Sequence, residues 1–219
     1  MWTDPRRAAF LPATVLVVVA VTMLGVPASA QCRPASERTG EVGCWIIARQ
    51  PLGRLASPTV FWHLHTFASR ADAEAEKGPR GTVIEALGSV WLSTIAAPGW
   101  RPRRGIRVAE IGPLEVEPAR SYTAQYMEGI FNADMTTEVH YHPGPEAVYT
   151  TAGAICFEMP DGTVSGGAGE AAVMPAGHLH TLTATGTAQR RSLALVVHES
   201  DRPWRLPSSD WVPKGLCKD

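Results

Sequence analysis

The amino-acid sequence predicts a fold dominated by β-strands. Its 219 residues include 20 glycines and 18 prolines, and this density of turn-forming residues favours short strands over long helices. Along the second half of the chain, short runs of apolar and β-branched residues alternate with turns such as Pro143-Gly144-Pro145. Many short strands at this spacing are typical of a β-sandwich or a small barrel, so we expect an all-β-dominated protein.

The charge and the apolar runs exclude two classes of partner. Twenty basic residues against 21 acidic ones give a formal net charge of -1, so no charge excess indicates nucleic-acid binding. The apolar run at 15–26 is shorter than the roughly 20 residues that span a bilayer, and no later run is longer. We therefore expect no nucleic-acid partner and no permanent membrane span.

The first 30 residues have the pattern of a secretory signal peptide. Two basic residues, Arg6 and Arg7, precede the apolar run, and the small-residue tripeptide Ala28-Ser29-Ala30 follows it. We therefore expect a signal peptide over residues 1–30 and an exported protein, periplasmic or extracellular.

The four cysteines all follow the predicted cleavage position, and an exported chain enters an oxidising compartment that allows disulfides. Three pairings are possible. The short separation favours Cys32 with Cys44, which leaves Cys156 with Cys217 to tie the C-terminal tail to the body. No CxxC spacing occurs, so the cysteines do not indicate a metal site.

Residues 31–119 predict a mixed N-terminal α/β segment. The aromatic and β-branched run at 59–67 predicts a strand. Residues 69–77 predict one short helix, because Ser69 is a favourable N-cap and Gly78 a stop. Whether this segment forms a small separate domain or adds strands to a barrel stays open at this stage.

Two stretches complete that segment. Residues 82–96 predict one or two further strands, and the prolines and glycines of residues 97–120 predict a connector with at most short strands. After it, residues 120–199 predict a barrel and residues 200–219 an extended tail over its surface. The strands expected in the barrel are 121–131, 137–142, 146–152, 154–159, 170–174, 178–184 and 191–198.

The chemistry concentrates around one histidine and glutamate constellation. Side chains alternate along a strand, so His140 and His142 project from the same face. The Pro-Gly-Pro corner then reverses the chain and can bring Glu146 beside them. A second turn at 175–177 leads into a strand that can deliver His180 to the same centre. Three imidazoles and one carboxylate suit a divalent transition metal such as Fe, Mn, Zn, Ni or Cu, with positions left open.

These residues resemble the two motifs of the cupin superfamily. His140, His142, Glu146 and Gly153 match the spacing of the first motif, and the second is matched by Gly169, Pro175, Gly177 and His180. The resemblance covers about residues 120–199. Two departures lie outside the proposed ligands: Asp134 and Ala184 stand where the motifs have glycine and asparagine. The chain is also similar to exported bacterial proteins with a single cupin domain.

The resemblance implies a double-stranded β-helix, the jelly-roll barrel of cupins. It implies that His140, His142, Glu146 and His180 bind the metal on the inner face of that barrel. It also implies a possible pairing of barrels, so a homodimer is an expectation that rests on resemblance alone.

The surroundings of the centre follow from strand alternation. Counting from Glu146 places Val148 and Thr150 on the inward face, where they predict a small substrate pocket. His178 shares a strand face with His180 and is expected to line that pocket or support the site. A second HxH pair, His63 and His65, is not followed by a glutamate at the motif distance, so we interpret it as structural.

Two functions follow from this pattern. The first is an exported metal-dependent enzyme that acts on a small molecule by oxygenase, lyase, isomerase or decarboxylase chemistry, with Glu146 as the catalytic base. The alternative is a non-catalytic module that binds a metal or a small ligand. A metal-free structural barrel is a third possibility, and the sequence does not choose among these.

Overall fold

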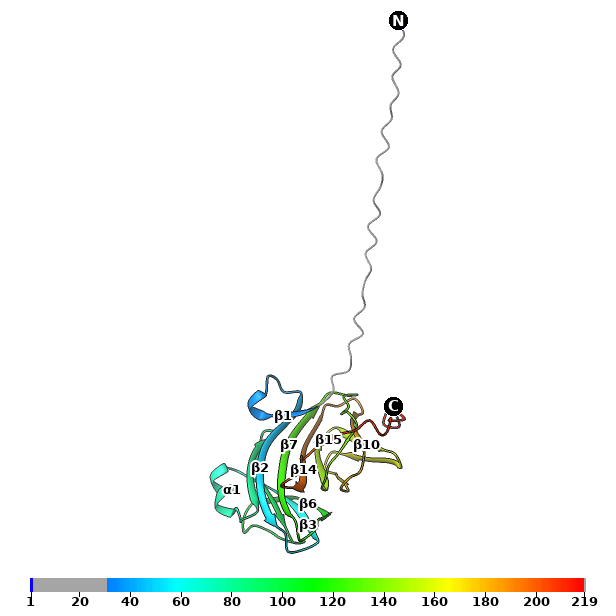
Figure 1. The fold of residues 1–219 in the computed structure, drawn as a ribbon. Helices are drawn as coiled ribbons and strands as arrows, with labels where there is room; N and C mark the ends of the chain where they lie inside the picture. The colour runs from blue at the N-terminus through cyan, green and yellow to red at the C-terminus, as the bar shows by residue number, and fades with distance from the viewer. Residues whose placement is uncertain (2–30, 219) are drawn as a thin grey trace.

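The structure is a computed structural model that describes Met1 and residues 31–218. The rest of the predicted signal peptide lies outside the described residues. Within residues 31–218 the chain forms strands β1 to β15, one short 3-10 helix at Ala35–Glu37 and one α-helix, α1 (Arg70–Glu76) (Figure 1). The all-β-dominated fold class is therefore confirmed.

The largest sheet has six strands, and β2, β7 and β14 run side by side through the molecule (Figure 1). β1 pairs with β2 in parallel, and the other neighbours pair antiparallel. The N-terminal segment thus adds two strands to the barrel sheet. The order is β1 (Cys32–Pro34), β2 (Gly43–Arg54), β7 (Ser121–Phe131), β14 (Arg190–Glu199), β9 (Glu146–Ala152) and β12 (Ala171–Met174).

The second half of the jelly roll is a smaller sheet that packs against one face of the large sheet. Side chains of both sheets, such as Phe157 and Leu182 from the small sheet and Val148 from β9, share one hydrophobic core. Beside it lies a two-stranded pair, β8 (His140–Tyr141) with β15 (Leu206–Pro207). The small sheet has the order β11 (Gly162–Gly167), β10 (Ala154–Met159) and β13 (Thr181–Thr185).

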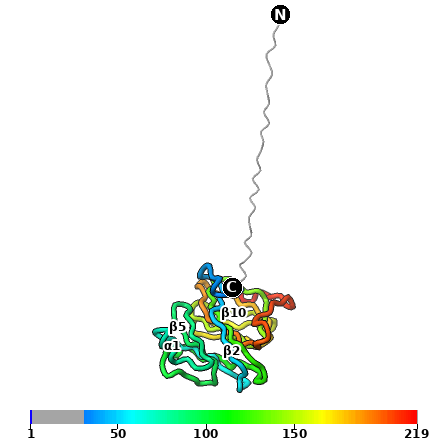
Figure 2. The backbone as a smooth tube through the Cα atoms, turned by 60° about the vertical axis from the view of Figure 1, so that its left-hand side comes forward, coloured from blue at the N-terminus to red at the C-terminus, as the bar shows by residue number. Residues whose placement is uncertain are grey.

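A separate four-stranded sheet covers the opposite face of the large sheet. Trp62 and Leu64 of this sheet share a second core with Tyr126 and Leu195 of β7 and β14. Figure 2 shows β5 and α1 on the side of the molecule away from β10. This sheet has the order β4 (Gly81–Ala86), β5 (Ser89–Ala96), β3 (Thr59–Phe67) and β6 (Ile106–Glu115).

The three-layer arrangement explains the unbroken apolar run in β14. Leu193, Leu195 and Val197 enter the core shared with the four-stranded sheet, whereas Ala194 and Val196 enter the core shared with β10 and β13. A strand buried on both faces needs apolar residues at every position rather than at alternate ones.

One expectation for the N-terminal segment was wrong. Residues 97–120 were predicted as a connector with at most short strands, but β6 (Ile106–Glu115) lies inside this stretch. Its Pro113 is tolerated because β6 is an edge strand, where a residue without an N–H group does not interrupt pairing on both sides. The helix expected at 69–77 is present as α1, with Ser69 at its N-cap.

Two disulfides join the pairs favoured by the sequence, Cys32 with Cys44 and Cys156 with Cys217. The first ties β1 to β2, and the second ties the C-terminal tail to β10. Disulfides persist in oxidising compartments, so both are consistent with an oxidising environment for this chain. Within residues 31–218, no helix combines the length and apolar character needed to cross a bilayer.

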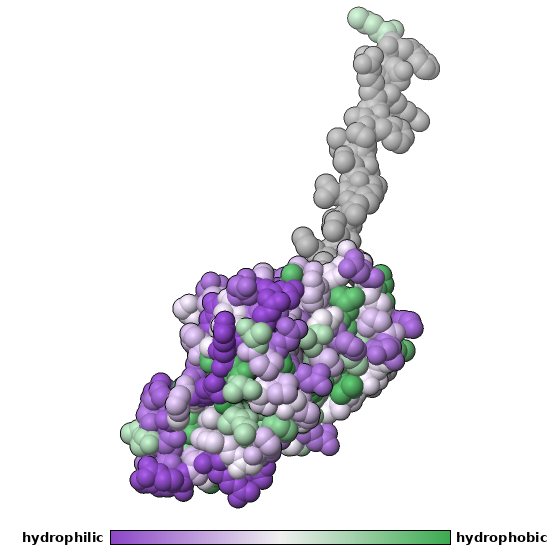
Figure 3. Space-filling view, turned by 60° about the horizontal axis from the view of Figure 1, so that its bottom comes forward, coloured by the Kyte–Doolittle hydropathy of each residue, from purple (hydrophilic) through white to green (hydrophobic). Residues whose placement is uncertain are grey.

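The surface that faces the viewer in Figure 3 is largely hydrophilic, with hydrophobic residues in small groups among the polar ones. Large apolar side chains exposed in the described part of the chain include Ile106, Val212 and Leu216. Single exposed apolar residues of this kind are ordinary on a folded protein.

The N-cap of α1 provides a test of local stability. The Ser69 side chain accepts a hydrogen bond from the Asp72 backbone N–H. We expect Ser69→Ala to lower the free energy of unfolding by about 1 kcal/mol, because one helical N–H loses its partner. Chemical denaturation of both proteins measures this. An unchanged unfolding midpoint and slope would show that the cap contributes nothing.

Candidate metal centre

Three buried imidazoles meet on the inner side of the jelly roll. His140 lies in β8, His142 follows it by two residues, and His180 immediately precedes β13. One candidate ligand atom from each ring lies within 4.8 Å of the others. Backbone pairing holds two of the rings together, because the His140 N–H donates to the His180 carbonyl (3.1 Å) and the His180 N–H to the His140 carbonyl (2.9 Å).

The two predicted turns shape this centre. In the turn that precedes His180, the Gly177 backbone N–H donates to the His142 carbonyl at 2.8 Å. At the Pro-Gly-Pro corner, a Cβ atom added to Gly144 would clash with the Val197 carbonyl oxygen. Only glycine permits so close an approach to β14, and the corner thereby returns the chain to Glu146 at the start of β9.

Hydrogen bonds to backbone carbonyls orient all three rings. The Nδ1 atoms of His140 and His142 lie 2.7 Å from the carbonyl oxygens of Glu138 and Trp204, and Nδ1 of His180 lies 2.9 Å from that of His178. A carbonyl oxygen only accepts, so Nδ1 carries the proton in each ring. In the neutral form of each ring, Nε2 then carries a lone pair, which is the arrangement found in metal-binding histidines.

Glu146 faces two of these nitrogens. Its Oε2 atom lies 3.2 Å from Nε2 of His180 and 3.6 Å from Nε2 of His142. All three atoms are buried and have no hydrogen-bond partner. Lone pairs on neutral imidazoles and a carboxylate repel one another unless a proton or a cation lies between them. The donor set therefore fits a bound divalent metal ion.

Two pKa values describe the site without a metal. Burial, followed by the neighbouring rings of His180 and His142, lowers the pKa of His140 to about 2. This imidazole is therefore neutral, the form that binds metals. Burial by itself would raise the pKa of Glu146, but the electrostatic influence of His142 and His180 outweighs it and holds that pKa well below its usual range. The carboxyl is therefore ionised.

A small cavity of about 40 Å³ opens beside these four residues. The Trp204 ring stacks on His142, with ring centroids 5.7 Å apart and planes inclined by 16°. The tail thus contributes to the wall of the cavity. Besides His140, His142, Glu146 and His180, its lining comprises Cys32, Cys44, Met127, Gly129, Phe131, Thr137, Leu182, Arg190, Ala194, Trp204 and Arg205.

The residues predicted for a substrate pocket lie elsewhere. Val148 is buried in the core between the two barrel sheets, and Thr150 is also fully buried, with no hydrogen-bond partner for its hydroxyl. His178 is half-buried and supports the centre through its backbone carbonyl. None of the three lines the small cavity.

The cavity residues that were not singled out from the sequence include Arg190, Trp204 and Arg205. The tail residues carry no local signal, because their position depends on how the tail folds back onto β8. Arg190 does carry a local signal. It lies an even number of residues before Ala194 and Val196 in β14, so its side chain is on the same strand face as these two residues, which belong to the core inside the jelly roll.

The second HxH pair occupies a different environment. His63 and His65 lie buried in β3, where Nε2 of His63 is 2.9 Å from the Ala97 carbonyl and both rings contact Trp100. Among the described residues, neither belongs to a cluster of three candidate ligands. Burial and then the charge of His63 lower the pKa of His65 to about 4.

This depressed pKa predicts a pH dependence of stability. Below pH 6.5 the unfolded chain protonates His65 and the folded chain does not, so unfolding takes up a proton. We expect the free energy of unfolding to fall as pH is lowered from 6.5 towards 4, by up to about 1.4 kcal/mol per pH unit from this residue. Denaturation of wild type and His65→Gln at pH 7 and pH 5 measures it. Equal losses in both proteins would contradict this assignment.

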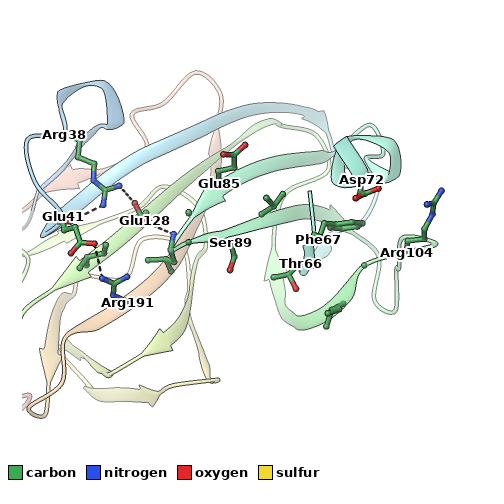
Figure 4. A pocket seen from close by; sticks show the side chains of 18 residues that line it. Arg38, Glu41, Thr66, Phe67, Asp72, Glu85, Ser89, Arg104, Glu128 and Arg191 are labelled. Atoms are coloured by element: carbon green, nitrogen blue, oxygen red, sulfur yellow. Dashed lines mark hydrogen bonds and ion pairs between the residues drawn. The ribbon is translucent and has the colours of Figure 1, made fainter. Parts of the chain in front are cut away.

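A much larger groove lies on another part of the surface. It has a volume of about 1070 Å³ and runs along the four-stranded sheet (Figure 4). Its charged side chains at one end are paired with each other, Arg38 with Glu128 and Arg191 with Glu41 at 3.3 Å. The groove does not contain the histidine cluster. The candidate site is therefore located by the meeting of unpaired candidate ligand atoms, and not by cavity volume.

Comparisons with known proteins found one family match and several solved structures. Residues 130–197 match the sequence family described as "Cupin domain". No curated protein matches the sequence. Among solved structures, a cupin-2 domain protein from Shewanella frigidimarina is 18% identical and covers 37% of this chain and 74% of its own, with a TM-score of 0.29.

Two further structures give similar values. A cupin domain from Bordetella pertussis is 19% identical over 40% of this chain and 91% of its own, with a TM-score of 0.30. A polyketide cyclase from Streptomyces resistomycificus is 23% identical over 42% of this chain and 63% of its own, with a TM-score of 0.32. The family match includes all four residues of the histidine and glutamate cluster. The match to the cupin domain family therefore applies to residues 130–197, the part of the chain that contains the candidate metal centre.

Proposed function

We propose that this protein binds one divalent transition metal ion through His140, His142, His180 and Glu146 and acts on a small molecule there. One observation carries the proposal: the unpartnered lone pairs of two Nε2 atoms and one carboxylate oxygen face one another at 3.2 and 3.6 Å. One bound cation between these atoms would satisfy all three of them at once.

The donor set limits the choice of metal without fixing it. Imidazole nitrogen suits Zn, Cu, Fe and Ni, and a carboxylate oxygen extends the range to Mn. Four protein ligands leave coordination positions open in five- or six-coordinate ions. A small molecule that enters the cavity can occupy such a position.

The metal would supply Lewis acidity, polarising an oxygen of the bound small molecule. The chain supplies the rest. The carbonyls of Glu138, Trp204 and His178 fix the ring orientations, so the site is organised before the ligand arrives. The Glu146 carboxylate faces the ring nitrogens, and in this proposal it is the base that accepts a proton from the bound molecule. Oxygenase, lyase, isomerase and decarboxylase reactions all fit these roles.

We place this activity outside the cytoplasm. Two disulfides support an oxidising compartment, and the signal-peptide pattern at residues 1–30 supports export. In this proposal residues 120–199 form the barrel and residues 200–219 form the tail. Residues 31–119 contribute strands to the six-stranded sheet and cover one face of it. Pairing of two barrels remains part of the proposal.

Cobalt(II) titration of the metal-free protein tests both the site and its open position. We expect one strong visible absorption change per chain and a second change when a small ligand joins the metal. A spectrum that responds to cobalt but to no small anion or neutral ligand would favour the non-catalytic binding module. The absence of any cobalt-dependent spectrum, in protein shown to be folded by circular dichroism, would contradict the proposal.

A further inference from the structure

A buried arginine lies in the wall of the same cavity. Arg190 begins β14 and is only 2% exposed, yet its side chain lines the cavity that contains the histidine cluster. Its guanidinium carbon lies 4.6 Å from the centre of the Phe131 ring, and one terminal nitrogen donates to the Ser192 hydroxyl. These contacts fix the direction in which the guanidinium points.

Most of the hydrogen-bonding capacity of Arg190 is unused. Its Nε and Nη1 atoms are buried and have no hydrogen-bond partner. Among the described residues, no carboxylate forms an ion pair with it within 4.0 Å. A guanidinium carries five N–H donors and stays charged in proteins, so a buried one without a counter-anion is costly.

A second guanidinium lines the cavity from the tail. Arg205 has a buried Nη2 atom without a hydrogen-bond partner, and that atom is 4.0 Å from Glu138 Oε2. This distance is at the limit of an ion pair and does not satisfy the donor. The start of β14 and the tail therefore both contribute N–H donors to the lining of one small cavity.

The charges of the site favour an anion. With the metal of the proposed function in place, a divalent cation and Arg190 face the single carboxylate of Glu146, which leaves the cavity positively charged. Arg205 and Glu138 offset each other. A ligand with one or two negative charges would neutralise the cavity and provide acceptors for the unpaired donors.

We propose that the cavity binds a compact carboxylate and that Arg190 holds its carboxylate group. Charge-assisted hydrogen bonds between a guanidinium and a carboxylate are strong, and Nε and Nη1 of Arg190 both have unused N–H donors. The small cavity volume of about 40 Å³ favours acids of few carbon atoms over larger ones. The carboxylate inference specifies the substrate class of the proposed function. It rests on the proposed function only for the role of the metal.

Isothermal titration with acetate, glycolate and pyruvate tests the assignment, using metal-free and zinc-loaded protein. Acetamide and glycolamide are matched neutral probes, and inorganic phosphate is a non-carboxylate anion. We expect at least one of the three carboxylates to bind and the amides not to bind. We expect Arg190→Gln to weaken that binding at least about 10-fold, since a charge-assisted pair is lost.

The neighbouring arginine is a matched control. Arg191 pairs with Glu41 at 3.3 Å on the outer surface and does not line the cavity, so Arg191→Gln should bind the carboxylate as the wild type does. Arg190→Lys retains the charge over Phe131 and replaces Arg190→Gln if that variant fails to fold. It should bind more weakly than the wild type, because the single ammonium of lysine does not reproduce the Nε and Nη1 donors.

Metal content, measured on the same samples, separates this inference from the proposed function. Carboxylate binding that depends on Arg190 in protein that takes up no metal would support the inference and overturn the metal site. Uptake of one metal per chain would leave the metal site intact even where the inference fails. The inference is overturned if no probe carboxylate binds, if the Arg190 variants bind as the wild type does, or if phosphate binds more tightly than every carboxylate.

Discussion

Replacing His142 by alanine should abolish tight metal binding. Loss of groups that only orient a ligand typically weakens metal affinity 10- to 100-fold, so loss of a ligand itself should weaken it by about 100-fold or more. The Nε2 atom of His142 faces Glu146 at 3.6 Å, and no other described imidazole is placed to replace it in the cluster. Competition with a chelator of known affinity measures the dissociation constant for zinc in both proteins.

His178→Ala is the matched control for this experiment. The His178 ring lies two residues from His180 but outside the cluster of candidate ligands. Its carbonyl, which accepts from Nδ1 of His180, remains in the alanine variant. We expect wild-type metal affinity within about 10-fold. Equal losses in the His142 and His178 variants, or full retention in both, would contradict the assigned ligand set.

Removing the disulfide between Cys156 and Cys217 should lower stability substantially. The bond joins residues 61 apart, and closing a loop of that length restricts the unfolded chain by about 4 kcal/mol in the chain-entropy description. For a chain of this size that corresponds to a melting temperature lower by roughly 8 to 16 °C. Thermal unfolding of the Cys156→Ala, Cys217→Ala double variant measures the change.

The second disulfide supplies an internal comparison. Cys32 and Cys44 are 12 residues apart, so the same description gives a smaller loss of about 3 kcal/mol when both become alanine.

Hydrogen bonds also hold the tail near Cys217. Glu158 accepts backbone N–H groups of Lys214, Gly215 and Leu216, and these contacts remain when the disulfide is removed. A loss below about 1 kcal/mol in the tail variant would show that these contacts, not the disulfide, fix the tail.

Local sequence patterns predicted the parts of the fold whose cause is local. The strands at 146–152 and 154–159 occur at those residues, since alternating apolar residues end at clear turns. The glycine-rich β11 was not predicted, because its sequence lacks strand-forming side chains and it is held by pairing with β10. β2 was also missed. Its pairing with β7 joins segments about 75 residues apart, beyond the reach of local patterns.

Local sequence patterns likewise predicted only part of the candidate site. The spacing of His140, His142 and His180 predicted their meeting, because two turns and one strand suffice to bring them together. Their role as metal ligands stays a prediction. Trp204 and Arg205 reach the cavity only because β15 pairs with β8, a contact between residues about 65 apart that no local pattern specifies.

Elemental analysis of the mature protein tests the central claim most directly. The protein is isolated without a histidine tag from the compartment to which its host exports it, alongside His140→Ala. The proposed centre predicts about one equivalent of Fe, Mn, Ni, Cu or Zn per chain in the wild type and almost none in the variant. A folded wild-type protein that contains no such metal and takes up none on reconstitution would contradict the metal centre.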